Sequence, residues 1–177
     1  VMGRTHVAAY RAADAAGFPC RLVAVGDADP RARAGLAPAG GNITAADADR
    51  LFDPAQVRAY EIVEQLAADP GVDAVSVCTP TDTHAAAATI LLRAGKHVLV
   101  EKPVSLRAPD IRALAHEARR AGRLCMPAMC MRFWQGWDWL AARIRDGSLG
   151  PVRSAVFTRL GARPAWSRAF YLDPARS

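Results

Sequence analysis

The chain has 177 residues, enough for one full domain or for one domain and part of another, and 51% of them are hydrophobic, which is ample for a core. No apolar stretch reaches the roughly 18 residues that cross a bilayer, so no membrane partner is expected. The formal net charge is +6, but the arginines are scattered without a basic motif, so nucleic acid is not expected as a partner.

The first part of the chain alternates helical and strand-like segments. A helix is predicted from Gly3 to Ala16, followed by an apolar strand from Cys20 to Gly26. A short helix is predicted to begin at Asp29-Pro30 and to reach Leu36. Residues 37–54 are rich in Gly, Ala and Asp without a clear period, and they are predicted to form a long loop.

The alternation continues through the middle of the chain. In chain order the predicted segments are strand Gln56–Tyr60, helix Glu61–Ala68, strand Asp73–Cys78, helix Thr83–Ala94, strand His97–Val100, helix Ala108–Ala121 and strand Arg123–Met131. Strands that alternate with helices in this way predict βαβ units, and therefore an α/β fold with a Rossmann-type, doubly wound parallel sheet.

The last segments differ in kind. Gly136–Asp146 is predicted to form an amphipathic helix, and Val152–Leu160 alternates polar and apolar residues, which is typical of a strand in a sheet with one exposed face. A domain boundary is therefore placed near residues 131–136. Both ends are expected to be cut, because Gly3 opens a helix with no strand before it and Tyr171–Ser177 has loop-like sequence.

The cysteines indicate the compartment. None of Cys20, Cys78, Cys125 and Cys130 belongs to a CxxC pair, so neither a disulfide framework nor a metal site is expected. Reduced thiols favour a cytoplasmic protein. An export signal upstream of residue 1 remains an open alternative.

A dinucleotide site is predicted where strands meet helices. Met2 and Gly3 fit the last two positions of G-x-G-x-x-G, whose first glycines would lie upstream. Asp27 follows the second strand at the spacing expected of the ribose-binding acid, which favours NAD over NADP; the alternative is an Asx-type cap of the next helix. Thr79 and Pro80 follow a later strand.

Histidines are interpreted by position. His84, two residues into a helix that starts at the ligand edge, is a candidate cofactor-binding residue, with a polar surface histidine as the alternative. His6, His97 and His116 are interpreted as structural.

The segment Val98–Val104 is the most informative part of the chain. An apolar strand runs directly into Glu101-Lys102-Pro103, so a carboxylate and an ammonium arrive together at the ligand edge of a parallel sheet. The chain has only two lysines, Lys96 and Lys102, against 21 arginines. Lysine can exchange a proton where arginine cannot, so Lys102 is the candidate catalytic residue. The alternative is a solvated lysine at the end of a strand.

Two motifs at a defined separation resemble a known family. C-T-P-x-x-x-H at residues 78–84 and A-G-K-H-V-L-V-E-K-P at residues 94–103 are similar to the Gfo/Idh/MocA oxidoreductases. M-R-F at residues 131–133 and G-S-L-G-P-V at residues 147–152 extend the resemblance over nearly the whole chain.

The resemblance implies a Rossmann domain over residues 1–132 with its first strand missing. It further implies, over residues 133–177, the start of a substrate and oligomerisation domain with an open, mostly antiparallel sheet through which a homo-oligomer would form. It implies hydride transfer between NAD, with NADP as the alternative, and a secondary alcohol of a sugar, cyclitol or related polyol. Lys102 would lie near the reacting hydroxyl, Glu101 near the nicotinamide ribose, and Thr79 and Pro80 along the cofactor.

Two departures from the family pattern stand out. The D-x-x-x-H motif that carries the family's catalytic Asp and His is not in this chain, so residues 1–177 by themselves are expected to be inactive. The loop at residues 37–54 is longer than the family's usual connection. Two other functions remain open: tightly held NAD used for elimination, hydrolysis or cofactor recycling, and a non-catalytic dinucleotide sensor.

Overall fold

The computed structural model describes residues 2–36, 50–161 and 173. In chain order its elements are α1 (Met2–Ala15), β1 (Ala24–Gly26), α2 (Pro30–Arg33), β2 (Arg58–Tyr60), α3 (Val63–Ala68), β3 (Ala74–Val77), α4 (Thr81–Arg93), β4 (His97–Val100), α5 (Ala108–Ala121), β5 (Cys125–Pro127), the 3₁₀ helix η1 (Cys130–Phe133) and α6 (Trp137–Arg145). The predicted alternation is confirmed, and β4 and α5 have the predicted bounds.

All strand pairs in the described residues are parallel. β1 pairs with β2, with Val25 opposite Ala59. β3, β4 and β5 form a second sheet, in which Val77 lies opposite Val100 and Val100 lies opposite Pro127. Among the described residues, no strand pair joins β1 to β3, so the two sheets are separate.

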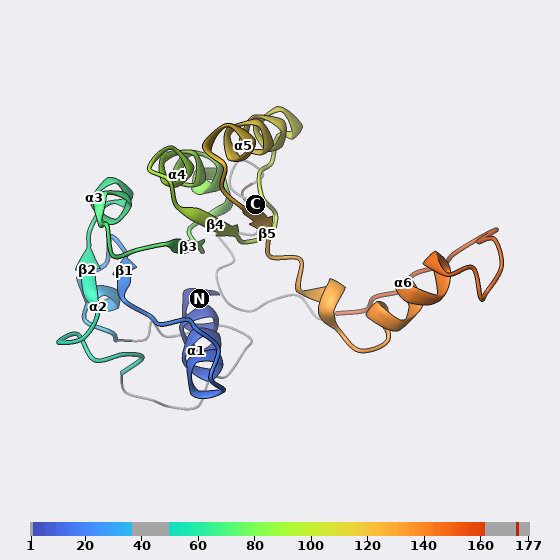
Figure 1. Ribbon diagram of the computed structural model, residues 1–177, viewed down its shortest axis with the longest axis horizontal. Coiled ribbons are helices and arrows are strands. Elements are labelled where there is room, and N and C mark those ends of the chain that lie inside the picture. Colours follow the sequence, from blue (N-terminus) through green and yellow to red (C-terminus); the bar gives the residue numbers. More distant parts are fainter. Residues whose placement is uncertain (1, 37–49, 162–172, 174–177) are drawn as a thin grey trace.

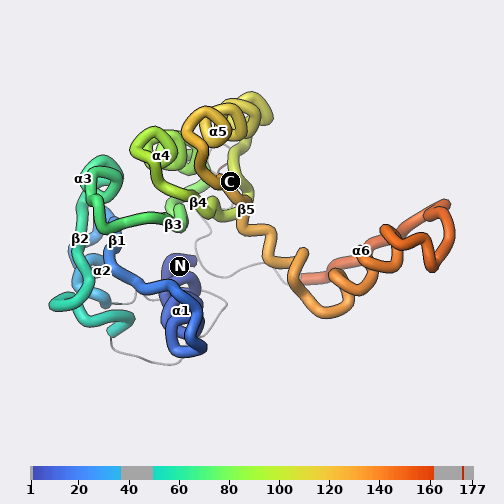
Figure 2. Tube along the Cα trace, in the orientation of Figure 1, coloured from blue at the N-terminus to red at the C-terminus, as the bar shows by residue number. Residues whose placement is uncertain are grey.

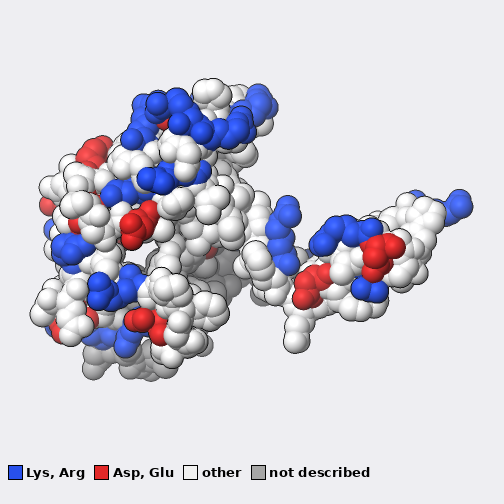
Figure 3. All heavy atoms as spheres, viewed as in Figure 1, with Lys and Arg blue, Asp and Glu red and all other residues white. Residues whose placement is uncertain are grey.

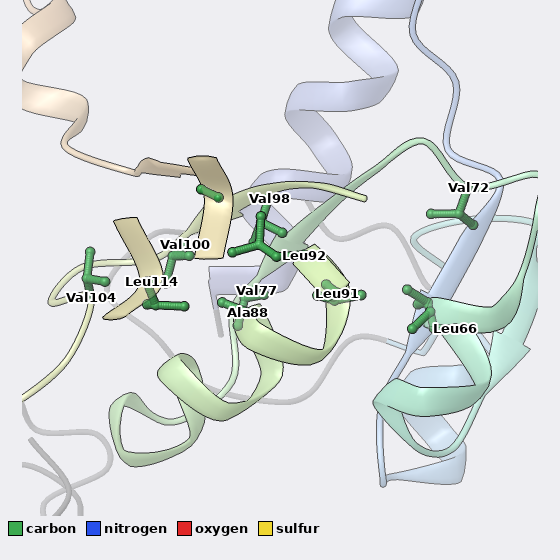
Figure 4. Packing of buried hydrophobic residues seen from close by; sticks show 12 residues of the cluster. Leu66, Val72, Val77, Ala88, Leu91, Leu92, Val98, Val100, Val104 and Leu114 are labelled. Atoms are coloured by element: carbon green, nitrogen blue, oxygen red, sulfur yellow. The ribbon is translucent and has the colours of Figure 1, made fainter. Parts of the chain in front are cut away.

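Helices cover both faces of the second sheet. Figure 1 shows α4 and α5 on one face and α1 on the other. The core lies between the sheet and helices α4 and α5, and it includes Leu91 and Leu92 from α4 and Val98 and Val100 from β4. Figure 4 shows Leu92 beside Val98. These two leucines and two valines are at most 2% exposed, and each fully buried leucine or valine contributes about 1.5–3 kcal/mol to folding.

The bounds of α5 were predicted correctly because both ends of the helix carry clear sequence signals. Pro109 stands in the first turn, where a missing N–H costs no hydrogen bond, and Gly122 ends the helix with φ of 62°. Arg119 and Arg120 lie in the last turn, where a positive charge favours the helix dipole. Positively charged side chains gather along this helix in Figure 3.

The C-terminal part corrects two predictions. The strand predicted to reach Met131 ends at Pro127 and is followed by η1. The strand predicted over Val152–Leu160 is wrong, because no strand, and no antiparallel sheet, occurs among the described residues there. A strand needs a partner for its backbone groups, and none of the described residues pairs with this segment. Val156 is accordingly 90% exposed.

The segment that follows α6 instead packs against α6. The rings of Trp137 and Phe157 stack with centroids 5.5 Å apart. α6 extends away from the α/β body in Figures 1 and 2. The domain boundary after residue 132 and self-association through a C-terminal sheet stay predictions.

Some predictions fall where the structure gives no description. The long loop predicted over residues 37–54 lies outside the described residues from 37 to 49, and residues 50–54 contain neither helix nor strand. Apart from Asp173, the loop predicted over Tyr171–Ser177 also lies outside them. Among the described helices, none has the length and hydrophobicity needed to span a bilayer.

Asp69, which ends α3, connects this helix to β2 and to the turn before β4. Its carboxylate accepts hydrogen bonds from the backbone N–H of Gly71 at 2.9 Å, from Nε of Arg58 at 2.6 Å and from the hydroxyl of Tyr60 at 2.9 Å. Its backbone carbonyl accepts from Nζ of Lys96 at 2.6 Å. The Gly71 hydrogen bond, together with those from Arg58 and Tyr60, lowers the pKa of Asp69 below its usual value.

We predict that Asp69→Asn destabilises the protein in a pH-dependent way. Because the folded pKa lies below the unfolded one, the carboxylate adds stability above the unfolded value, and this is lost as the pH falls through the folded value. The Tm of the variant should lie several degrees below wild type at neutral pH, and the gap should close below about pH 4. Asp73→Asn, on a neighbouring exposed carboxylate, is the control and should show no such gap.

Candidate cofactor-binding site

The ends of three strands carry the predicted site residues. β1 ends at Gly26, directly before Asp27. β3 ends two residues before Thr79, and β4 ends directly before Glu101. Because β3 and β4 are parallel and in register, Thr79 and Glu101 lie at the same edge of the sheet, the edge at which open α/β sheets bind ligands.

The N-terminal end of α1 reaches this edge. The ring of His6 contacts the side chains of Ser76 and Glu101, which belong to β3 and to the turn after β4. Met2 and Gly3 stand one turn before His6, so the start of α1 lies close to Glu101. A Cβ added at Gly3 would have no described atom within 4 Å, so the packing of this chain does not require glycine there. The space beside Gly3 is open, and helix N-termini suit phosphate groups.

Glu101 is a buried carboxylate, only 6% exposed. Its Oε1 lies 2.9 Å from Nε2 of His6, and its Oε2 accepts a hydrogen bond from the backbone N–H of Lys102 at 2.9 Å. Both oxygens are therefore satisfied, as a buried carboxylate requires.

The two lysines have different environments. Lys96 is 7% exposed, and its ammonium donates to the carbonyl of Asp69, so its role is structural. The side chain of Lys102 is exposed, and no hydrogen bond or ion pair of its ammonium is found among the described residues. The charge of Lys102 is therefore available to a ligand at the edge of the sheet.

His84 connects the two loops that follow β3 and β4. It is 1% exposed, so the alternative of a surface histidine is wrong. Its Nε2 lies 2.8 Å from the carbonyl of Thr79, and its Nδ1 lies 2.9 Å from the carbonyl of Pro103. Both ring nitrogens are thus occupied by the protein, and His84 supports the loops that carry Thr79 and Lys102.

Thr79 and Pro80 are both exposed at the edge of the sheet, directly before α4. The hydroxyl of Thr83 lies 2.8 Å from that of Thr79 and 2.7 Å from the carbonyl of Pro80. The first turn of α4 therefore fixes this loop, and its outer surface is open to a ligand.

Asp27 is exposed, and one of its carboxylate oxygens accepts a hydrogen bond from the backbone N–H of Asp29 at 2.9 Å. Asp29, not Asp27, caps α2 by accepting from the N–H of Arg31. The Asx-type turn is therefore real, but it uses one oxygen of Asp27; for the other, the described residues contribute no hydrogen bond. Arg33 donates to the carbonyl of Asp27 and holds the turn in place.

The thiol of Cys78, directly before Thr79, stays protonated at neutral pH. Burial, and to a smaller extent the charge of Glu101, raises the pKa of Cys78 to about 12. All four cysteines are free. Within the described ranges, no three His, Cys, Asp or Glu side chains are grouped so that they could hold a metal ion.

His6 is the residue that sequence reasoning placed among structural histidines and that the structure brings to the site. Its position one turn after Gly3 was the available signal, because that turn of α1 had to lie near the ligand edge. Of the other histidines, His97 accepts a hydrogen bond from the backbone N–H of Leu124 at Nδ1, and His116 is exposed on α5.

A parallel sheet with helices on both faces, a helix start open at Gly3 and an exposed carboxylate at Asp27 together define a dinucleotide-binding domain. Residues 1–129 match the family model described as "Oxidoreductase family, NAD-binding Rossmann fold", GFO_IDH_MocA. The chain belongs to the Gfo/Idh/MocA oxidoreductase family, and its residues 1–129 correspond to that family's NAD-binding domain.

Among curated proteins, the chain is similar to trans-1,2-dihydrobenzene-1,2-diol dehydrogenase of Macaca fuscata fuscata, with 39% identity over 98 residues that cover 55% of this chain and 29% of that protein. It is also 37% identical to inositol 2-dehydrogenase 1 of Saccharopolyspora erythraea over 152 residues, which cover 85% of this chain and 40% of that one. The chain therefore spans well under half the length of these relatives.

Solved structures agree with this assignment. An NAD-binding oxidoreductase from Klebsiella pneumoniae matches with a TM-score of 0.67 at 28% identity, covering 85% of this chain and 37% of that one. A putative myo-inositol dehydrogenase from Sinorhizobium meliloti 1021 matches with a TM-score of 0.62 at 30% identity, covering 84% of this chain and 39% of that one.

We predict that His84→Phe destabilises the protein and weakens NAD binding. The substitution keeps a ring but removes both ring nitrogens that contact the carbonyls of Thr79 and Pro103, and the loss of a donor to a partly buried carbonyl costs about 1–3 kcal/mol. Denaturant unfolding of the intact protein and NAD titration by fluorescence measure the two effects. His116→Phe, on an exposed ring of α5, is the control, and equal behaviour of the two variants would contradict the linking role.

Proposed function

We propose that the intact protein containing this chain is an NAD-dependent dehydrogenase that transfers a hydride between nicotinamide and a secondary alcohol of a sugar, cyclitol or related polyol. The observation that carries the proposal is the exposed ammonium of Lys102 at the ligand edge, on the turn that the buried Glu101 holds. The names of the two curated relatives support the substrate class, because inositol and trans-1,2-dihydrobenzene-1,2-diol are both six-membered carbon rings with neighbouring secondary hydroxyls.

The proposed role of Lys102 follows from the chemistry of alcohol oxidation. Bound NAD supplies the hydride acceptor. A hydride leaves the carbinol carbon only as the hydroxyl proton is withdrawn, and a positive charge beside the developing alkoxide stabilises it. Lys102 acts at the hydroxyl oxygen through Nζ, either as an ammonium that stabilises the alkoxide or as a neutral amine that takes the proton.

The other site residues bind and orient the cofactor in this proposal. The open N-terminal turn of α1 at Met2 and Gly3 accommodates the pyrophosphate. The exposed carboxylate of Asp27 accepts hydrogen bonds from the adenosine ribose and repels a 2′-phosphate. In this proposal Thr79 and Pro80, which follow β3, lie along the cofactor on the side of the helix start away from Asp27.

The proposal is tested by NADH formation from the intact protein with myo-inositol, scyllo-inositol and trans-cyclohexane-1,2-diol as alcohols. We predict that Lys102→Met lowers kcat about 100-fold or more and leaves the Tm within a few degrees of wild type, because the exposed charge serves chemistry and not folding. Lys102→Arg should fail as well, since the guanidinium fork neither exchanges a proton nor makes a point contact.

The other lysine provides a matched control. Lys96→Met removes the buried ammonium that binds the Asp69 carbonyl, so it should lower the Tm while the folded protein keeps its kcat. If Lys102→Met unfolded early and retained kcat, Lys102 would be a structural strand-end residue and the proposed function would be wrong.

Cofactor choice gives a further prediction. Asp27→Ala should weaken NAD binding roughly tenfold or more, because hydrogen bonds to a charged group are lost, and should weaken NADP binding far less. Isothermal titration of the intact protein with both cofactors measures the ratio. Asp29→Ala alters the neighbouring carboxylate, which caps α2, and should leave the ratio unchanged. Equal weakening of both cofactors by Asp27→Ala would contradict the assignment.

A further inference from the structure

A chain of side chains connects α1 to the turn after β4. The hydroxyl of Tyr10 lies 2.7 Å from Oγ of Ser76, and Oγ of Ser76 lies 3.1 Å from Nδ1 of His6. Nε2 of His6 lies 2.9 Å from Oε1 of Glu101. These contacts join residues that are 66 to 95 positions apart in the sequence, and they link the helix that starts the dinucleotide site to the turn that carries Lys102.

The hydrogen bonds that link these four side chains can all be formed at once when each donates toward Glu101. The carboxylate of Glu101 has no proton to give, so Nε2 of His6 donates to it. In the neutral ring Nδ1 then accepts from the hydroxyl of Ser76, whose oxygen accepts in turn from Tyr10. Both ring nitrogens of His6 therefore have hydrogen-bond partners, which fixes the plane of its ring.

His6 is the residue through which this chain acts on Glu101. The side chains of His6 and Glu101 are 15% and 8% exposed, so water competes little for the contact. Within the described parts of the protein, no other side chain has a hydrogen bond to the Glu101 carboxylate. The second oxygen of that carboxylate holds the backbone N–H of Lys102, so the orientation of Glu101 sets the position from which the Lys102 side chain leaves the backbone.

We propose that His6 is a positioning residue for Lys102. His6 holds the Glu101 carboxylate in the orientation that binds the Lys102 amide, and the ammonium of Lys102 is thereby directed to the ligand edge. The importance of that position for catalysis rests on the proposed function, whereas the link from His6 to the Lys102 amide does not. Displacement of a reacting group by about 1 Å lowers catalysis by as much as 100-fold, so this link affects the rate.

Two polar substitutions of His6 separate this role from packing. The amide nitrogen of glutamine reaches the place of Nε2, whereas the shorter asparagine reaches only the place of Nδ1. His6→Gln therefore keeps the donor to Glu101, and His6→Asn loses it but keeps the contact to Ser76. Tyr10→Phe removes the far end of the chain and serves as a control for α1.

The first measurement needs neither NAD nor substrate. Site-resolved hydrogen exchange of the intact protein reports the protection of the Lys102 amide, which the Glu101 carboxylate provides. Exchange of this amide should be about tenfold faster in His6→Asn than in wild type, and close to wild type in His6→Gln and Tyr10→Phe. Equal exchange in His6→Asn and wild type would overturn the inference, whatever the protein catalyses.

The second measurement is a mutant cycle on kcat at saturating NAD, with the fastest of the three alcohols named above. His6→Asn should lower kcat about tenfold, His6→Gln should restore most of it, and His6→Asn should have little further effect in the Lys102→Met background. An equal loss in both backgrounds would show that His6 does not act through Lys102. An unchanged kcat in Lys102→Met alone would instead overturn the proposed function, and the exchange measurement would still decide the link from His6.

Discussion

The site depends on one buried carboxylate. Removing the charge of Glu101 from water is costly unless both oxygens are hydrogen-bonded, and the fold satisfies them with the ring of His6 and the amide of Lys102. These partners come from α1 and from the turn after β4, so the charge can be satisfied only when helix and sheet are assembled. The same requirement that stabilises the burial of Glu101 therefore brings the helix start and the lysine together.

The arrangement of the strands makes this possible. In a parallel sheet the carboxyl ends of neighbouring strands lie at one edge, so residues that follow β3 and β4 become neighbours although the chain separates them by more than 20 positions. His84 adds a second connection at this edge, between the loops after these strands. Two histidines with buried or half-buried rings thus hold the turn around Lys102 from opposite sides, one through a side chain and one through backbone carbonyls.

The two lysines have the same side chain but different roles, because one ammonium is buried and the other is exposed. Lys96 and Lys102 lie six residues apart on either side of β4, in a chain that otherwise uses arginine for positive charge. The ammonium of Lys96 is buried at the start of the strand, where it binds the backbone carbonyl of Asp69. The ammonium of Lys102 is exposed at the end of the strand, where ligands approach.

The sequence by itself determined the elements whose signals are local. The alternation of helices and strands, the bounds of α5 between Pro109 and Gly122, and the position of Glu101-Lys102 at a strand end all followed from propensity, capping and periodicity. The resemblance carried by residues 78–103 gave the family. These signals suffice because each is set by residues within one or two turns of the chain.

Only the tertiary structure decided how polar side chains are used. His84 is buried and links two loops, and His6 binds Glu101 from 95 positions away, because hydrogen-bond partners of buried groups are chosen by the packing of distant elements. The same reason explains the failure over Val152–Leu160, where an alternating pattern predicts a strand but no described segment lies beside it to pair with. Periodicity specifies which face of a strand would be buried, and a neighbouring strand decides whether the strand forms.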